Sequence, residues 1–185
     1  MVFQSFDAVL ALVAQVVVLL LMAGFAALSV VAFLRRNRVL VLVAAGLLAL
    51  ALLLAALPAS SAPLVITALV SLAALAGGVL GGDPATRFVF DRTSFDEQEG
   101  AHGGIVEGGR ERLRGGRMIG LLERTALVGA ILAGYPEALA AIIAIKGVGR
   151  FTELETPGAR ERFIVGTLTS WIWASAAACV VLLVR

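Results

Sequence analysis

Long apolar runs separated by short polar or glycine-rich breaks dominate the pattern of this chain. A helix needs about 20 apolar residues to cross roughly 30 Å of hydrocarbon. Six runs reach or approach that length, so the pattern predicts an all-α, integral membrane bundle of about six transmembrane helices. The predicted helices cover residues 6–34, 39–57, 63–82, 117–133, 136–151 and 163–184.

The fourth and fifth runs are short, and they meet at a turn formed by Gly134, Tyr135 and Pro136. At 1.5 Å per residue, each helix would be only about 25 Å long. The two runs therefore either cross the membrane as an upright hairpin or form a re-entrant hairpin buried against the other helices.

Composition supports a membrane protein and excludes several functions. Hydrophobic residues make up 60% of the 185 residues, and the mean hydropathy is +0.99, whereas soluble domains are about 45–50% apolar. The net charge of +2 gives no reason to expect nucleic acid as a partner. Cys179 is the only cysteine, which excludes an internal disulfide and a cysteine-based zinc site. The first run exceeds the length of a signal-peptide core, so we expect a retained helix.

The arginines and lysines gather in alternate connections between the runs, which bears on orientation because basic loops usually face the cytoplasm. With six spans, all of these connections lie on one side. The pattern predicts a multi-pass protein of the cell membrane, such as the bacterial inner membrane, with both termini outside. The basic residues in and around these connections are Arg35, Arg36, Arg38, Arg87, Arg92, Arg110, Arg112, Arg114, Arg117, Lys146, Arg150, Arg160 and Arg162.

Three parts follow from this division: a three-helix N-terminal half (1–82), a glycine-rich cytoplasmic loop (83–116) and a three-helix C-terminal half (117–185). Within the loop, residues 87–92 suggest a short strand or an interfacial stretch. We expect the basic run 110–117 to contact anionic lipid headgroups. Flexible acidic loops often have such a composition without binding a metal, so we expect no metal and no cofactor at Asp96, Glu97, Glu99 and His102.

Small residues recur every fourth position on two of the predicted helices, and such stripes allow close helix packing in lipid. We expect them to pack inside the bundle; the alternative is a homodimer seam. In either case Trp171 and Trp173 fall in mid-helix, where at least one should pack against the bundle or line a cavity. The two stripes are Gly77/Gly81 and Gly166/Ser170/Ala174.

Four charges lie within or beside the two short runs, although an ionisable group at membrane depth costs about 2.5–3.5 kcal/mol. Glu123 precedes Tyr135 by 12 residues and Lys146 follows it by 11. A hairpin therefore places them at equal depth, which predicts an ion pair. Arg124 and Arg150 have no equally obvious partner.

These charges define a candidate cation-rich intramembrane site on the cytoplasmic side. The site has five basic groups but only three available carboxylates, Glu123, Glu153 and Glu161. An anion would balance the surplus of positive charge. The alternatives are a structural network in which long side chains reach the interface and an ion relay through Glu123. The candidate ligand-binding residues are Arg117, Glu123, Arg124, Lys146, Arg150, Glu153, Arg162, Thr167 and Ser170.

The segments GRMIGLLER (116–124), IAIKGVGRFTEL (143–154) and ERFIVGTLTSW (161–171) are similar to motifs of a bacterial polytopic membrane protein family. That family carries G-R-x-I-G-x-L-E-R, K-x-x-x-R-F-x-E and G-T-L-x-S, and the similarity covers about residues 116–175. Gly147 stands where serine is expected, and the N-terminal half shows no resemblance. Because the family has no assigned activity, the resemblance implies a site and no substrate. It selects Arg117, Gly120, Glu123, Arg124, Lys146, Arg150, Glu153, Glu161, Gly166, Thr167 and Ser170.

Two functions fit these observations. A small transporter or a lipid- or anion-binding protein would need a water-filled cavity that reaches Lys146. A non-enzymatic scaffold or complex subunit would instead pair its charges internally in a dry network. An enzyme acting on lipid headgroups has the least support, because the sequence offers neither a nucleophile–base set nor a metal triad.

Overall fold

The computed structural model describes residues 2–57, 61–92, 115–149 and 157–185, and six α-helices account for nearly all of them. No strand occurs in these ranges, so the prediction of an all-α fold is confirmed for them. The helices are α1 (Val2–Arg35), α2 (Arg38–Ala55), α3 (Leu64–Phe90), α4 (Gly115–Leu132), α5 (Ala138–Gly149) and α6 (Pro157–Val184).

Four of these helices, α1, α2, α3 and α6, are long and apolar enough to cross a membrane. The outward-facing surface agrees with that, because Leu12, Leu53, Leu72 and Ile172 are exposed along different helices. Many exposed large apolar side chains of this kind are suited to lipid and unfavourable in water. The other two helices differ: α4 carries three charges among its 18 residues, and α5 has only 12 residues.

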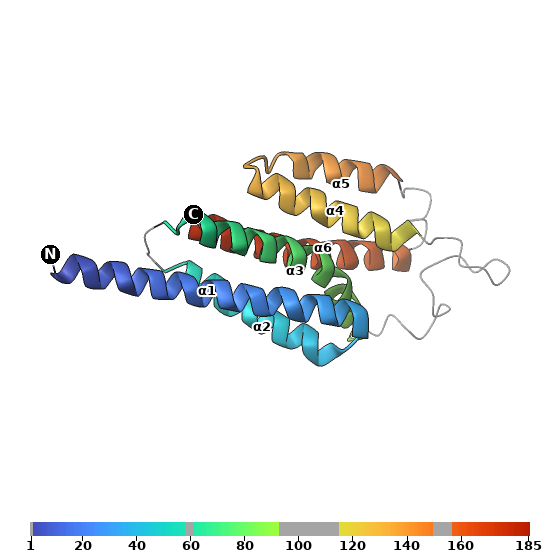
Figure 1. The fold of residues 1–185 in the computed structure, drawn as a ribbon. Coiled ribbons are helices and arrows are strands. Elements are labelled where there is room, and N and C mark those ends of the chain that lie inside the picture. The colour runs from blue at the N-terminus through green and yellow to red at the C-terminus, as the bar shows by residue number, and fades with distance from the viewer. Residues whose placement is uncertain (1, 58–60, 93–114, 150–156) are drawn as a thin grey trace.

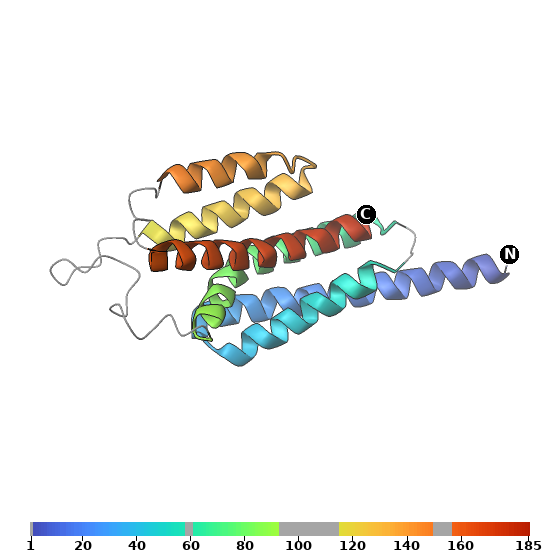
Figure 2. The same cartoon turned by 180° about the vertical axis from the view of Figure 1, so that it is seen from behind.

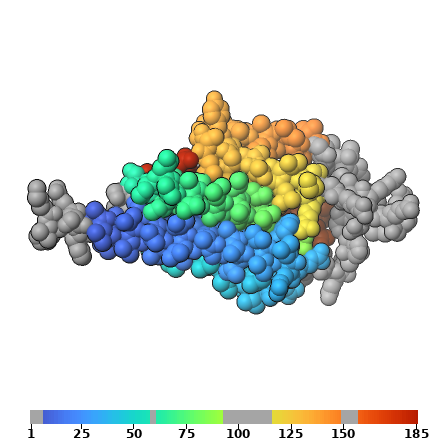
Figure 3. All heavy atoms as spheres, in the orientation of Figure 1, coloured from blue at the N-terminus to red at the C-terminus, as the bar shows by residue number. Residues whose placement is uncertain are grey.

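The bundle has three layers (Figures 1 and 2). Helices α3 and α6 form the central layer, with α1 and α2 on one side and the α4–α5 hairpin on the other. Met22, Phe25, Val70 and Val181 are completely buried where α1, α3 and α6 meet. In the space-filling view, side chains close the spaces between α1, α3 and α4 (Figure 3).

Glycines of α3 allow the central layer to pack closely. A β-carbon at Gly77 would overlap the Phe25 ring, and one at Gly81 would overlap the Trp173 indole. The Trp173 Nε1 donates a hydrogen bond of 3.1 Å to the Gly77 carbonyl, so one tryptophan packs inside the bundle as expected. Helices of the same chain cover this face, as the expectation of internal packing predicts. The alternative, a homodimer through Gly77/Gly81 or Gly166/Ser170/Ala174, stays a prediction.

The glycine stripe of α6 is also covered within the chain. A β-carbon at Gly166 would lie 2.9 Å from the Phe90 ring, while Ser170 and Ala174 are buried. Phe90 belongs to α3, so this stripe too serves internal packing.

The end of α3 corrects the sequence interpretation. The helix continues past Gly82 and through Pro84 to Phe90, so the loop does not begin at residue 83 and residues 87–92 form no strand. Proline inside a helix removes one hydrogen bond, but packing and hydroxyl groups from neighbouring turns compensate for the loss in buried helices. Pro84 is buried, and the Thr86 hydroxyl donates to the Gly82 carbonyl at 2.8 Å. The last turns change direction and approach the α1–α2 connection (Figure 2).

Candidate functional site

The Glu123 carboxylate of α4 accepts a hydrogen bond from the Lys146 ammonium of α5, which confirms the predicted ion pair. The two side chains are only 11% and 16% exposed, respectively. Phe163 of α6 covers the lysine, with its ring centroid 5.7 Å from Nζ. Lys146 is therefore neutralised within the chain.

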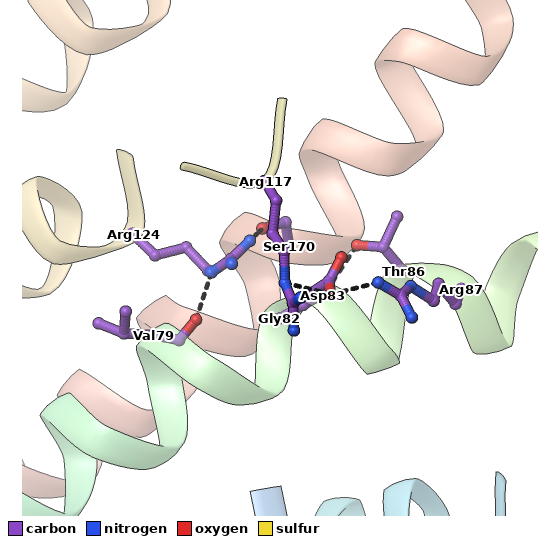
Figure 4. A network of polar contacts seen from close by, with 8 residues as sticks. All are labelled: Val79, Gly82, Asp83, Thr86, Arg87, Arg117, Arg124 and Ser170. Carbon is purple, nitrogen blue, oxygen red and sulfur yellow. Dashed lines mark hydrogen bonds and ion pairs between the residues drawn. The ribbon is translucent and has the colours of Figure 1, made fainter. Parts of the chain in front are cut away.

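Arg124 of α4 is the most deeply buried charge described, with 4% exposure. Its Nε donates to the Val79 carbonyl at 2.5 Å, and a terminal nitrogen donates to the Ser170 hydroxyl at 2.9 Å (Figure 4). Space for the side chain comes from Gly82 and Gly120, because a β-carbon at either position would lie within 3.3 Å of it. Arg124 thus bridges α4 to α3 and α6.

Arg117, at the start of α4, turns toward Asp83 of α3 (Figure 4). Its Nε lies 3.9 Å from the Asp83 carboxylate, and its guanidinium lies 4.0 Å from the centroid of the Phe33 ring. Asp83 also forms a 2.7 Å ion pair with Arg87, one turn further along α3. This carboxylate therefore holds two arginines at the same end of the bundle.

A cavity of about 400 Å³ opens at this end, between the α1–α2 connection, the bent end of α3 and the start of α6. We call it the basic cavity. Three phenylalanines, Phe33, Phe88 and Phe90, form much of its apolar wall. Its charged lining residues are Arg36, Arg38, Arg87, Arg162, Asp83 and Asp91.

Both aspartates in the basic cavity form ion pairs with arginines of the cavity. Arg38 pairs with Asp91 at 3.0 Å and Arg87 pairs with Asp83 at 2.7 Å. Within the described ranges, Arg36 and Arg162 form no ion pair. Arg162 instead lies over the Phe90 ring, 5.3 Å from its centroid. The cavity therefore carries two positive charges more than its own carboxylates balance.

The predicted site residues are thus distributed over separate places. Lys146 lines neither the basic cavity nor a second cavity beside Arg185 at the other end of the bundle. Thr167 is half-buried on α6. Arg150 and Glu153 lie outside the described residues, as do the loop acids, His102 and the arginines at 110, 112 and 114.

Sequence reasoning treated the arginines after α1 only as orientation signals and placed Asp83 in a loop. The usable signal for a site was the dense basic run Arg35, Arg36 and Arg38 between two apolar helices. This run does not indicate which of its arginines lines the basic cavity. The position of the cavity depends on the continuation of α3 beyond Pro84.

The fold and this cavity define the class: a helical membrane protein with an arginine-lined cavity at one end of its bundle. No protein-family model, no curated protein and no solved structure matches the chain, and the family resemblance accordingly stays a prediction.

Proposed function

We propose that this multi-pass membrane protein binds an anionic ligand, a lipid headgroup or a soluble anion, in the basic cavity. One observation carries the proposal: Arg36 and Arg162 line a cavity of about 400 Å³ without an ion-pair partner among the described residues. Small-molecule sites usually have volumes of about 300–1,000 Å³, so the cavity can hold a headgroup or a small metabolite.

Electrostatics favour an anion over a neutral ligand. Guanidinium groups bind phosphate and carboxylate through paired, charge-assisted hydrogen bonds. The Arg162 guanidinium lies over the Phe90 ring in a cation–π contact that favours its position beside the cavity. An anion in the cavity would therefore meet at least one pre-oriented donor. Its negative charge would balance the positive charge that Asp83 and Asp91 leave unbalanced.

The proposed topology has both termini outside and the basic cavity at the cytoplasmic surface of the cell membrane. Its support is that both chain ends lie at one end of the bundle, whereas the cavity arginines lie at the other (Figure 1). Basic residues concentrate on the cytoplasmic side of membrane proteins. We further propose that α4 and α5 cross the membrane as an upright hairpin.

A second candidate function is a non-enzymatic scaffold or complex subunit, and one observation favours it. Two buried charges of the C-terminal half are satisfied internally, Lys146 by Glu123 and Arg124 by Val79 and Ser170. Transport through the C-terminal half would require these contacts to open. Ligand binding at the basic cavity requires no such change, so binding is the favoured form of the proposal.

Lipid retention tests this proposal. The full chain is placed in nanodiscs that contain phosphatidylglycerol and phosphatidylcholine, and retained lipids are counted by native mass spectrometry. We expect preferential retention of phosphatidylglycerol, and its loss in an Arg36→Gly/Arg162→Gln variant. Arg35→Gln is the matched control, because Arg35 is exposed at the same end and does not line the cavity. Equal retention by all three proteins would favour the scaffold.

A further inference from the structure

The backbone at Arg36 has an unusual conformation for a residue that is not glycine. Its φ is 49°, the left-handed region. Its amide donates to the Ala32 carbonyl at 3.1 Å and so closes the C-terminus of α1. Glycine is the usual residue at such a helix end because a β-carbon is disfavoured there. An arginine at this position is therefore costly for the backbone, and strained residues are found preferentially at functional sites.

Asn37 fixes the direction in which the chain leaves this strained residue. Its side-chain oxygen accepts a 2.9 Å hydrogen bond from the Val39 amide and caps α2. The connection between α1 and α2 is thus pinned on both sides of Arg36. The Arg36 side chain lines the basic cavity from this pinned connection.

Arg162 reaches the same cavity from the first turns of α6, held over Phe90. The two cavity arginines that form no ion pair among the described residues therefore come from separate elements. The other cavity arginines, Arg38 and Arg87, are balanced by Asp91 and Asp83. A single ligand that contacts both Arg36 and Arg162 would need two negative charges to balance the site.

Phosphate monoesters and diesters differ in this property. A monoester carries about −1.5 to −2 charges at pH 7 because its second pKa is near 6, whereas a diester carries one charge. We infer that the basic cavity selects phosphate monoesters over phosphate diesters, with Arg36 and Arg162 as the two specificity-determining residues. This inference rests on the proposed anion-binding function and narrows its ligand to one chemical class.

Competition within one particle provides the test. Nanodiscs of phosphatidylcholine hold the full chain with equal amounts of phosphatidic acid, a monoester, and phosphatidylglycerol, a diester. Because both lipids share the particle, a difference in surface potential cannot mimic selectivity. We expect about tenfold preferential retention of phosphatidic acid, the size of one additional charge-assisted contact. The preference should shrink toward pH 5, roughly a unit below the second phosphate pKa.

The variants distinguish the effect of a lost charge on lipid binding from an effect on folding. Arg36→Gly removes the charge and also relieves the left-handed backbone, so the protein should melt at the same or a higher temperature. Arg36→Gly and Arg162→Gln should each abolish the preference for phosphatidic acid and retain part of the binding of phosphatidylglycerol. Arg35→Gln should leave the preference unchanged.

Soluble glycerol 3-phosphate distinguishes the source of the monoester. Displacement of phosphatidic acid by it indicates a phosphorylated metabolite, and no displacement indicates a lipid; both outcomes support monoester chemistry. Equal retention of the two lipids, or stronger retention of phosphatidylglycerol, would overturn the inference and leave the proposed function standing. Retention of neither anionic lipid above phosphatidylcholine, together with no binding of glycerol 3-phosphate, would instead overturn the proposed function itself.

Discussion

The Glu123 carboxylate and the Lys146 ammonium form an ion pair that joins α4 to α5 across a hairpin. Because both side chains are largely buried, removal of one partner leaves a charge without compensation. We predict that Glu123→Gln lowers the free energy of unfolding by about 3 kcal/mol, as for other buried pairs that lose one member. The double variant Glu123→Gln/Lys146→Met should lose less than the sum of the two single variants.

Equilibrium unfolding in mixed detergent micelles measures this effect. Glu137→Gln provides the control, since Glu137 is exposed in the turn of the same hairpin. A stability of Glu123→Gln equal to that of this control would show that the pair contributes nothing.

The close packing of the Arg124 side chain against Gly82 leads to a second prediction. A β-carbon at Gly82 would lie 2.5 Å from the Arg124 side chain, whereas one at Gly46 in α2 meets nothing within 4 Å. Gly82→Ala should therefore destabilise the protein by about 1–3 kcal/mol through overpacking. Gly46→Ala should stabilise it slightly, because alanine is the better helix former. Similar melting temperatures for the two variants would contradict the close packing of Arg124 on α3.

Asp83 would compete for arginine with an anion bound in the basic cavity. It pairs with Arg87 at 2.7 Å and lies 3.9 Å from Arg117. Asp83→Asn should raise the affinity for anionic lipid roughly fivefold, because it removes a nearby negative charge and releases Arg87. Lipid retention in nanodiscs measures the change, with Asp7→Asn near the N-terminus as the control. Weaker retention by Asp83→Asn would mean that its ion pairs hold the cavity open.

The ion pair between Glu123 and Lys146 was predictable because one turn fixes the register of a hairpin. The partners of Arg124 were not, since they depend on how α4 packs against two helices distant in sequence. Pro84 misled the sequence interpretation because burial offsets its lost hydrogen bond. The basic cavity was missed for a related reason. Arg38 pairs with Asp91 across 53 positions, and the sequence alone does not indicate this pairing.

The proposed topology, with both termini outside and an upright α4–α5 hairpin, predicts different labelling of two engineered cysteines. In a Cys179→Ala background, Arg35→Cys and Tyr135→Cys place single thiols at exposed positions at opposite ends of the bundle. A membrane-impermeant maleimide added to intact cells should label the Tyr135→Cys variant and spare the Arg35→Cys variant. Inverted vesicles should give the opposite result. Labelling of both from the same side would indicate a re-entrant α4–α5 hairpin.

Photo-crosslinking from within the basic cavity tests the central claim of anion binding most directly. A benzoylphenylalanine at Phe88 lines the cavity, whereas one at Leu72 occupies the exposed surface of the same helix. We predict that the Phe88 probe captures phosphatidic acid in membranes and loses this adduct when Arg36→Gly and Arg162→Gln are combined. The Leu72 probe should capture bulk lipid in both backgrounds. A Phe88 adduct that is unchanged without the two arginines would contradict the assignment of the cavity as an anion site.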